Sequence, residues 1–400
     1  MSTILLIGGF LIISVAANHL SGFFTRFNLP LITGLLIIGI LSGPFVFGLI
    51  TTDSWHKLNF INEISLAFIA FAASAELYLK ELRNRLNSIK WMTFTQLIVT
   101  FTLSSVGIYL MGDMLPFISE LGVKGRIAIA ILIGTIFIAR SPASAIALIS
   151  EMRAKGPFTQ TVMGVTVLID FLVIILFTIN LSIGIALIND EEISFAFISI
   201  LLIEMGASFG LGMLLGKLIQ LILGRRMSLN VKGVLIVLSG YMAYVLDHHV
   251  EIESLEYLGK SYKLEPLLIC IIGSFWITNH TRYRAEFTKI LKDISLYIYV
   301  PFFTLIGVSL SLDLLVQFAG ITLILFLIRL GSIMIGAYLG GAIVKDPPLF
   351  KRVGWMPYIT QAGVGLGLTT IAAHTFPQLG VEFSTLVIST IVLNQIVGPP

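Results

Sequence analysis

Long apolar runs, separated by short polar connections, dominate the chain from end to end. Thirteen such segments can be drawn, at 3–21, 28–50, 59–79, 91–112, 126–150, 159–187, 193–216, 230–247, 264–279, 293–309, 315–344, 355–375 and 382–399. A helix needs roughly 20 apolar residues to cross a bilayer core, and these runs are continuous rather than alternating as in a β-barrel. The pattern predicts an all-α polytopic membrane protein with about 13 transmembrane helices.

Composition supports this interpretation. Of the 400 residues, 56% are hydrophobic and 12% are charged, whereas a soluble domain is about 25% charged. The mean hydropathy is +0.98. One cysteine, Cys270, cannot form an internal disulfide, and no Cys/His cluster has metal-binding spacing. We therefore expect no cofactor, no resident metal and no soluble domain. The first segment lacks the basic flank of a signal peptide and is interpreted as a spanning helix.

Basic residues are distributed unevenly between the loops. Of the 25 Lys and Arg residues, Arg140 and Arg329 lie inside apolar segments. One set of alternate loops holds only Lys57, Lys124, Arg126, Lys260 and Lys263. All the others fall in the opposite set, which the positive-inside rule places in the cytoplasm. An odd number of spans then puts the N-terminus outside and the C-terminus in the cytoplasm, as is typical of a bacterial inner membrane protein.

Two segments contain residues that interrupt a helix. The fifth contains ARSPAS at 139–144, where Pro142 removes an amide donor and clashes with the preceding turn. The twelfth contains TQAGVGLGLTT at 360–370, where Gly363, Gly365 and Gly367 weaken helical order. Freed backbone groups at membrane depth are tolerated only where they face protein or a cavity. The alternative is that the glycines only permit close helix packing.

The two interrupted segments occupy matching places in the chain. Each is the fourth of five consecutive segments, and the two enter the membrane from opposite sides. They predict two inverted repeats, approximately 28–187 and 264–400, with broken helices that cross near the midplane. This arrangement is typical of a secondary transporter.

Four ionisable side chains lie well inside apolar segments, where each costs roughly 2.5–3.5 kcal/mol. They are Arg140, Asp170, Glu204 and Arg329. Asp170 has no other charge near it in the sequence, and a carboxylate in such surroundings binds a proton readily. It can therefore alternate between holding a proton and holding a cation. The alternative for Asp170 is a fixed ion pair or hydrogen bond.

Arg140 stands at the first interruption and stays protonated, so it cannot itself carry the proton. Three roles are open: it compensates the negative C-terminal end of the first half-helix, it pairs with Asp170 when no substrate is bound, or it binds an anion. Ser141 is expected to cap the second half-helix, and Pro142 to fill its first position.

Other polar groups receive structural interpretations. We expect Glu204 at a helix interface or lipid contact, and Arg329 in contact with a carbonyl at a broken helix or with a carboxylate. Asp247, His248 and His249 form a polar cluster at the outer end of the eighth segment. A metal site needs further ligands, so a solvated helix end leading into a surface loop is favoured over an enzyme centre.

Three longer stretches resemble a known family. FNLPLITGLLIIGILSGPFVFGLI at 27–50, RSPASAIALISEMRAKGPFTQTVMGVTVLIDFLVIILF at 140–177 and YVPFFTLIGVSLSLDLL at 299–315 are similar, in this order, to parts of the monovalent cation:proton antiporter superfamily. The resemblance covers nearly the whole chain as a single membrane domain, 1–400. It implies an antiporter fold of thirteen helices, a homodimer, and a dimerisation domain beside an elevator-like core that includes 91–187 and 315–375.

The resemblance also assigns residues by position. Asp170 matches the family's essential aspartate, Ser141 and Pro142 its first break, Gly363 and Gly365 its second break, and Arg329 a common basic position. This sequence departs from the family at Ile169, where the family has Asn or Asp, and at Arg140, where it has Thr. It has no lysine in the 295–309 helix, where electrogenic members often have one.

These departures shape the predicted function. With one carboxylate, a simple site exchanges one proton for one Na⁺ or K⁺ and moves no net charge. Ser141, Thr135 and Gln361 are candidate oxygen ligands beside Asp170, since hard cations favour oxygen. A cation that joins an Arg⁺/Asp⁻ pair leaves an unfavourable net charge in a low dielectric. Two alternatives therefore stay open: an anion-handling variant that uses Arg140, and a non-transporting sensor. Neither enzyme activity nor nucleic-acid binding is expected.

Overall fold

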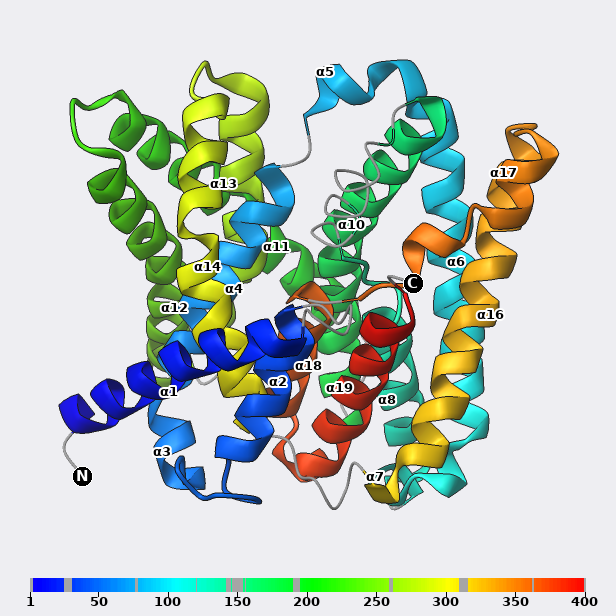
Figure 1. Ribbon diagram of the computed structural model, residues 1–400, viewed down its shortest axis with the longest axis horizontal. Helices are drawn as coiled ribbons and strands as arrows, with labels where there is room; N and C mark the ends of the chain where they lie inside the picture. Colours follow the sequence, from blue (N-terminus) through cyan, green and yellow to red (C-terminus); the bar gives the residue numbers. More distant parts are fainter. Residues whose placement is uncertain are drawn as a thin grey trace. The chain divides into compact units, whose positions relative to one another are not determined.

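A computed structural model of the chain describes residues 3–24, 31–75, 78–119, 121–141, 145, 154, 156–189, 195–258, 262–308, 316–361 and 363–398. All regular secondary structure within these residues is helical (Figure 1). Because a bilayer core offers no hydrogen-bond partners, an apolar chain that crosses it must satisfy its backbone internally, and a helix does so within one segment. The all-helical architecture expected from the apolar pattern is confirmed.

The chain divides into two compact units. Unit 1 comprises Met1–Asn59, Leu82–Asp190 and Val300–Pro400, and unit 2 comprises Phe60–Glu81 and Glu191–Tyr299. The residue ranges expected to form the moving core, 91–187 and 315–375, both fall within unit 1.

Unit 1 contains most of the helices. These are α1 (Thr3–Phe24), α2 (Leu31–Ser42), α3 (Thr52–Lys57), η2 (Arg83–Arg85), α6 (Leu86–Leu110), η3 (Gly112–Met114), α7 (Pro116–Ser119), α8 (Gly122–Ile136), α10 (Pro157–Ile188), α16 (Ala319–Ile343), α17 (Pro348–Val353), η4 (Met356–Tyr358), α18 (Gly363–Thr375), η5 (Pro377–Leu379) and α19 (Gly380–Val397). In Figure 1, α6 and α16 lie side by side, and both pack against neighbours within this unit.

Unit 2 holds α4 (Asn59–Ala75) almost entirely, α5 (Leu79–Leu82), α11 (Phe195–Gly224), α12 (Leu229–Leu258), α13 (Pro266–His280) and the first part of α14 (Arg284–Val308). The chain that enters α13 is held by side chains of two other helices. Backbone amides of residues 263–265 donate to the Glu204 carboxylate at 2.9 Å, the Asp247 carboxylate at 2.8 Å and the Ser208 hydroxyl at 2.9 Å. Glu204 thus contacts a helix entry, in agreement with a structural role.

Within the described residues, six helices are long and apolar enough to cross a membrane: Leu86–Leu110, Pro157–Ile188, Leu202–Gly224, Leu229–Tyr257, Arg284–Val308 and Ala319–Ile343. Shorter apolar helices are Leu6–Gly22, Asn59–Ala75, Pro266–His280 and Val381–Gln395. All of them overlap expected apolar segments.

Several expected boundaries are wrong. Helix α14 begins at Arg284 rather than near 293, and α11 ends at Gly224 rather than near 216. Two others change the expected loops. The segment drawn over 28–50 is helical only to Ser42, because the residue before Pro44 is disfavoured in a helix; the chain then turns, with the Gly48 amide donating to the Gly43 carbonyl at 2.9 Å. The eighth segment, expected to end near 247 in a surface loop, continues as α12 to Leu258. Its extension, VEIESLEYL at 250–258, is rich in the strong helix formers Glu and Leu.

Two glycines bring α2 and α14 into backbone contact. A Cβ added at Gly39 would lie 2.8 Å from the Gly307 Cα, closer than real Cβ atoms approach. Gly39 and Gly307 belong to two of the stretches that carry the family resemblance. Small residues at such a crossing permit the close approach that drives helix association in membranes.

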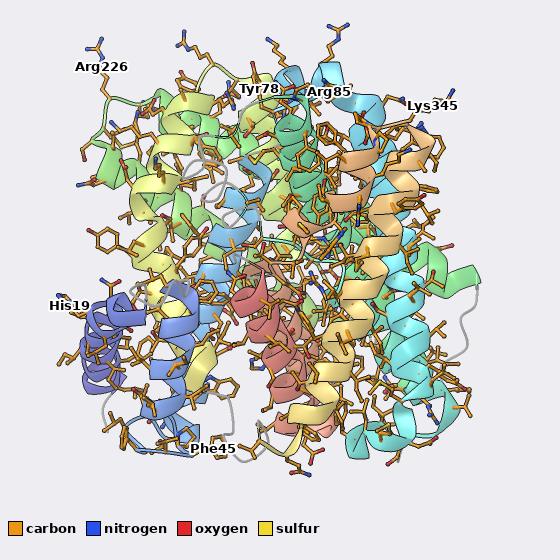
Figure 2. The ribbon with its side chains drawn as sticks, turned by 45° about the vertical axis from the view of Figure 1, so that its right-hand side comes forward. His19, Phe45, Tyr78, Arg85, Arg226 and Lys345 are labelled. Carbon is orange, nitrogen blue, oxygen red and sulfur yellow. The ribbon has the colours of Figure 1, made fainter. Side chains whose placement is uncertain are left out.

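Two loops of the basic set lie at the same end of unit 1. Figure 2 shows Arg85 and Lys345 at that end and Phe45, which follows α2, at the opposite end. The positions of these three residues agree with the alternation of loops expected from the apolar segments.

Candidate functional site

The fifth apolar segment is interrupted where the sequence predicts it. Helix α8 ends at Ile136, and residues 139–141 have no regular structure. Helical hydrogen bonding resumes with the Ala145 amide, which donates to the Ser141 carbonyl at 3.1 Å. Because the first helical bond is accepted by the N-cap carbonyl, Ser141 has the backbone position of a cap. The other half of that prediction, Pro142, lies outside the described residues.

The twelfth segment is also interrupted, but not at its glycines. Residues 359–361 are non-helical, whereas Gly363, Gly365 and Gly367 lie within α18. The expectation that the glycines form the break is wrong, because glycine weakens a helix without preventing it. A Cβ at Gly365 would lie 2.7 Å from the Gln361 Nε2. This glycine therefore provides room for a side chain of the break.

Arg329, fully buried on α16, joins the two interruptions. Its Nε donates to the Phe137 carbonyl at 2.9 Å and its Nη2 to the Ala139 carbonyl at 3.0 Å, both at the first break. Its Nη1 donates to the Ile359 carbonyl of the second break and to the Asn394 Oδ1, each at 2.7 Å. Of the two contacts expected for Arg329, the structure shows the one with carbonyls. The guanidinium compensates free carbonyls at both breaks.

Gln361 forms a second connection between the breaks. Its Nε2 donates to the Ile136 carbonyl at 2.6 Å, and its Oε1 accepts from the Asn394 Nδ2 at 3.4 Å. Asn394, on α19, thus contacts both Gln361 and Arg329. The amide oxygen expected as a cation ligand is already hydrogen bonded within the protein in this conformation.

Asp170 lies in the middle of α10, with no exposed surface. Its Oδ1 accepts from the Arg140 backbone amide at 2.9 Å. Its Oδ2 has no hydrogen-bond partner among the described residues. The carboxylate is therefore held at the first break by one oxygen, and the other oxygen has free acceptor capacity.

The Arg140 side chain is buried and turned toward other acceptors. Nη1 donates to the Phe137 carbonyl at 3.3 Å and to the Ala139 carbonyl at 3.5 Å, and Nη2 donates to the Gln96 Oε1 on α6 at 3.3 Å. Within the described part of the chain, no ion pair joins this guanidinium to a carboxylate. Of the three open roles, these contacts agree with compensation of the half-helix end. Arg140 contacts Asp170 through a hydrogen bond from its backbone amide and not through its guanidinium.

Thr135, in the last turn of α8, is held by a neighbour on α10. Its hydroxyl donates to the Ile131 carbonyl at 2.6 Å and accepts from the Asn180 Nδ2 at 2.7 Å. Like Gln361, it fixes the half-helix and is already engaged in hydrogen bonds.

Sequence reasoning missed three amide side chains at the site: Gln96, Asn180 and Asn394. Each is buried within a segment expected to span the membrane. Charged side chains inside apolar segments were recognised as candidate site residues. Uncharged amides inside such segments carry the same signal and would have identified these three residues.

The site combines three formal charges with two free helix ends. Arg140 and Arg329 supply positive charge, and Asp170 supplies negative charge. The carbonyls of the half-helix ends carry partial negative charge, roughly half a unit per helix terminus, and accept from both arginines. Asp170 is the one carboxylate of this group among the described residues, and its Oδ2 keeps free acceptor capacity.

Several known proteins resemble this chain over most of its length. The family model described as the transmembrane part of the sodium/hydrogen exchanger matches residues 10–256. The probable Na⁺/H⁺ antiporter GerT of Bacillus cereus is 24% identical over 80% of this chain and 77% of its own length. The Na⁺/H⁺-K⁺ antiporter GerN of the same organism is 22% identical over 94% of this chain and 89% of its own.

A solved structure has the same fold. The sodium proton antiporter MjNhaP1 of Methanocaldococcus jannaschii superposes with a TM-score of 0.75 at 18% identity, covering 99% of this chain and 96% of the other. The antiporter fold expected from the sequence is confirmed by this likeness, while the number of thirteen spanning helices stays a prediction.

Proposed function

This chain belongs to the sodium/hydrogen exchanger family of integral membrane proteins, and from this premise we propose that it exchanges Na⁺ or K⁺ for protons through Asp170. The proposal rests mainly on the difference between the two oxygens of the Asp170 carboxylate. Oδ1 is fixed by the Arg140 amide, whereas Oδ2 is buried and without a partner among the described residues. The relatives named as Na⁺/H⁺ antiporters support the choice of ions.

The orientation of Arg140 supports cation binding at this position. A guanidinium paired with Asp170 would compete with a cation, since both neutralise the same charge. Here the guanidinium donates to the Phe137 carbonyl and the Gln96 amide oxygen instead. Arg140 thus contributes positive charge to the free half-helix end and leaves Oδ2 for the transported ion.

The proposed cycle exchanges one ion for one proton. Asp170 is the single carboxylate of the site among the described residues, so loss of its proton and gain of one monovalent cation leave the charge unchanged. Ser141 is the proposed first companion ligand, while Thr135 and Gln361 position the half-helix ends in this conformation. We extend the proposal to an elevator-like movement of a core that includes 91–187 and 315–375.

We further propose a homodimer in a bacterial inner membrane, with the N-terminus outside and the C-terminus in the cytoplasm. The excess of basic residues in one set of loops supports the orientation. The family resemblance is what supports the dimer and the elevator.

Transport by purified protein in proteoliposomes tests the proposal. A trapped pH dye reports an imposed pH gradient while Na⁺, K⁺, Li⁺ or common anions are added in turn. We expect Na⁺ or K⁺ to collapse the gradient without generating a membrane potential. If no cation acts and an anion does, the cation proposal is wrong.

Replacing Arg140 by Thr, the family's residue at this position, is expected to lower the apparent KM for Na⁺ by about tenfold. The reason is that one positive charge leaves the surroundings of the bound cation. Arg140→Lys, which keeps the charge, is the matched control and should leave the KM near the wild-type value. Initial rates of gradient collapse at varied Na⁺ give the KM. An Arg140→Thr variant that acquires cation exchange absent from the wild type would instead show that Arg140 occupies the cation position.

A further inference from the structure

Helix α6 carries a row of buried polar side chains on one face. Thr93, Gln96, Thr100 and Ser104 recur at intervals of three and four residues, which places them along one side of a helix. They are 2%, 0%, 0% and 0% exposed, so lipid does not reach them. With a rise of about 1.5 Å per residue, this row extends roughly 16 Å along the helix. We refer to these four residues as the α6 row.

The hydroxyls of the α6 row do not make the backbone hydrogen bond that many helical hydroxyls of this chain make. Buried hydroxyls without a partner also occur elsewhere in the described residues, for example at Ser14, Thr278 and Thr385, but only one to a helix. A buried Thr or Ser in a helix commonly donates to the carbonyl four residues earlier. Many do so here: Thr95, Thr135, Thr166, Thr369, Thr370, Thr375 and Thr390. The hydroxyls of Thr93, Thr100 and Ser104 have no hydrogen-bond partner among the described residues.

Such groups need a partner of another kind. A buried hydroxyl without a hydrogen-bond partner is costly, so three of them along one face of a helix call for an explanation. Buried water resides where several polar groups surround one position, and it makes two to four hydrogen bonds there. A row of hydroxyls spaced by one helical turn offers such positions in succession.

The α6 row also reaches the candidate site. Gln96 accepts the hydrogen bond from the Arg140 Nη2, and Arg140 holds Asp170 through its backbone amide. The Arg140 Nε and the Asp170 Oδ2 are themselves buried without partners in the described part of the chain. Helix α6 packs against α8, α10 and α16, so the row lies inside unit 1 rather than on its surface.

We propose that the α6 row binds a file of water molecules, through which protons travel between one membrane surface and the Arg140–Asp170 region. The water-binding part stands on the unpaired hydroxyls alone, and the proton-carrying part rests on the proposed function. Water is the occupant because every member of the row is neutral and can both donate and accept, as relay of a proton along hydrogen bonds requires.

Cysteine accessibility tests the water-binding part without any transport. Cys270 is the only cysteine, and Cys270→Ala gives a cysteine-free background. Thr100→Cys and Ser104→Cys are small changes that preserve the row. Silver ion, which is small enough to follow a file of water molecules, binds thiolate, which forms in contact with water. We expect both to react at least about tenfold faster than Ile98→Cys, which lies exposed on the outer face of α6. Equal or slower reaction at both positions overturns the proposal.

The proton-carrying part is tested with the double substitution Thr100→Val and Ser104→Ala, which keeps volume but removes both hydroxyls. We expect cation-driven proton movement to slow about tenfold with the KM for Na⁺ unchanged. The matched control is Thr95→Val on the same helix, whose hydroxyl already donates to the Trp91 carbonyl at 2.9 Å. An unchanged rate in the double variant overturns the proton path. If the wild type shows no cation-driven proton movement, the proposed function is wrong. The cysteine accessibility experiment still decides in that case whether the α6 row binds water.

Discussion

Replacing Asp170 by Asn is expected to reduce cation-driven proton movement to below about one hundredth of the wild-type rate, because an amide neither ionises nor releases a proton. Asn keeps an oxygen that can accept from the Arg140 amide, so the hydrogen bond of 2.9 Å at the break can persist. The fold is therefore expected to survive. Fluorescence of a trapped pH dye after addition of Na⁺ or K⁺ measures the rate.

The chain supplies a matched control for this substitution. Glu204 is also a carboxylate inside an apolar segment, but its Oε1 accepts from the Lys263 backbone amide at the entry to α13. Glu204→Gln preserves an acceptor there and is expected to transport at a rate near that of the wild type. If Asp170→Asn transports as well as Glu204→Gln does, Asp170 is not the shared group.

The pH dependence follows from competition at the same oxygen. When protons and Na⁺ exclude each other from Asp170, the apparent KM for Na⁺ rises as the pH falls, by up to about tenfold per pH unit in the range where the site takes up its proton. The maximal rate at saturating Na⁺ falls less, because excess cation displaces the proton. In Asp170→Asn, any residual flux should lack this dependence.

Much of the fold was predictable because the bilayer imposes a simple requirement. Apolar segments of spanning length must become helices, and the described helices follow them closely. The first break was also predictable, since an X-Pro step disfavours the helical conformation in the chain before it. The second was expected at 360–370 and attributed to its glycines, which proved to be helical, because glycine permits several conformations and does not specify one. The position of the interruption, 359–361, depends on tertiary contacts such as that of Ile359 with Arg329.

The charged residues of the site were predictable from the sequence, but their hydrogen-bond partners were not. A charge inside an apolar segment is conspicuous, and Arg140, Asp170 and Arg329 were all found in this way. Their partners are backbone carbonyls and the neutral amides of Gln96 and Asn394, which a sequence pattern does not distinguish from other polar residues. Pair interactions between residues 44 to 65 positions apart require the packed structure.

The two arginines also differ in a way that the sequence does not reveal. Arg329 makes four hydrogen bonds of 2.7–3.0 Å that use all of its nitrogens. Arg140 makes longer ones, of 3.3–3.5 Å, and its Nε has no partner among the described residues. Arg329 is therefore held by more and shorter hydrogen bonds than Arg140, and we expect Arg140 to be the more easily displaced of the two side chains.

Replacing Arg329 by Met is accordingly expected to be the most damaging single change to the protein's stability. Met has a similar length but no donors, so the carbonyls of Phe137, Ala139 and Ile359 lose a shared partner at membrane depth. A buried acceptor that is left without its partner costs about 1–3 kcal/mol. We expect a clearly lower apparent unfolding temperature in detergent, together with loss of transport because both breaks lose their common anchor.

Two further substitutions separate this explanation from a general loss of basic charge. Arg329→Lys keeps the charge but provides donors on one nitrogen only, so it should give an intermediate unfolding temperature. Arg226→Met removes a basic residue from an exposed loop and should leave both stability and transport unchanged. An Arg329→Met variant that unfolds and transports as Arg226→Met does would show that the breaks are held by the Gln361–Ile136 and Gln361–Asn394 contacts alone. The expected order of stability, wild type above Lys above Met, follows directly from the number of acceptors that each side chain satisfies.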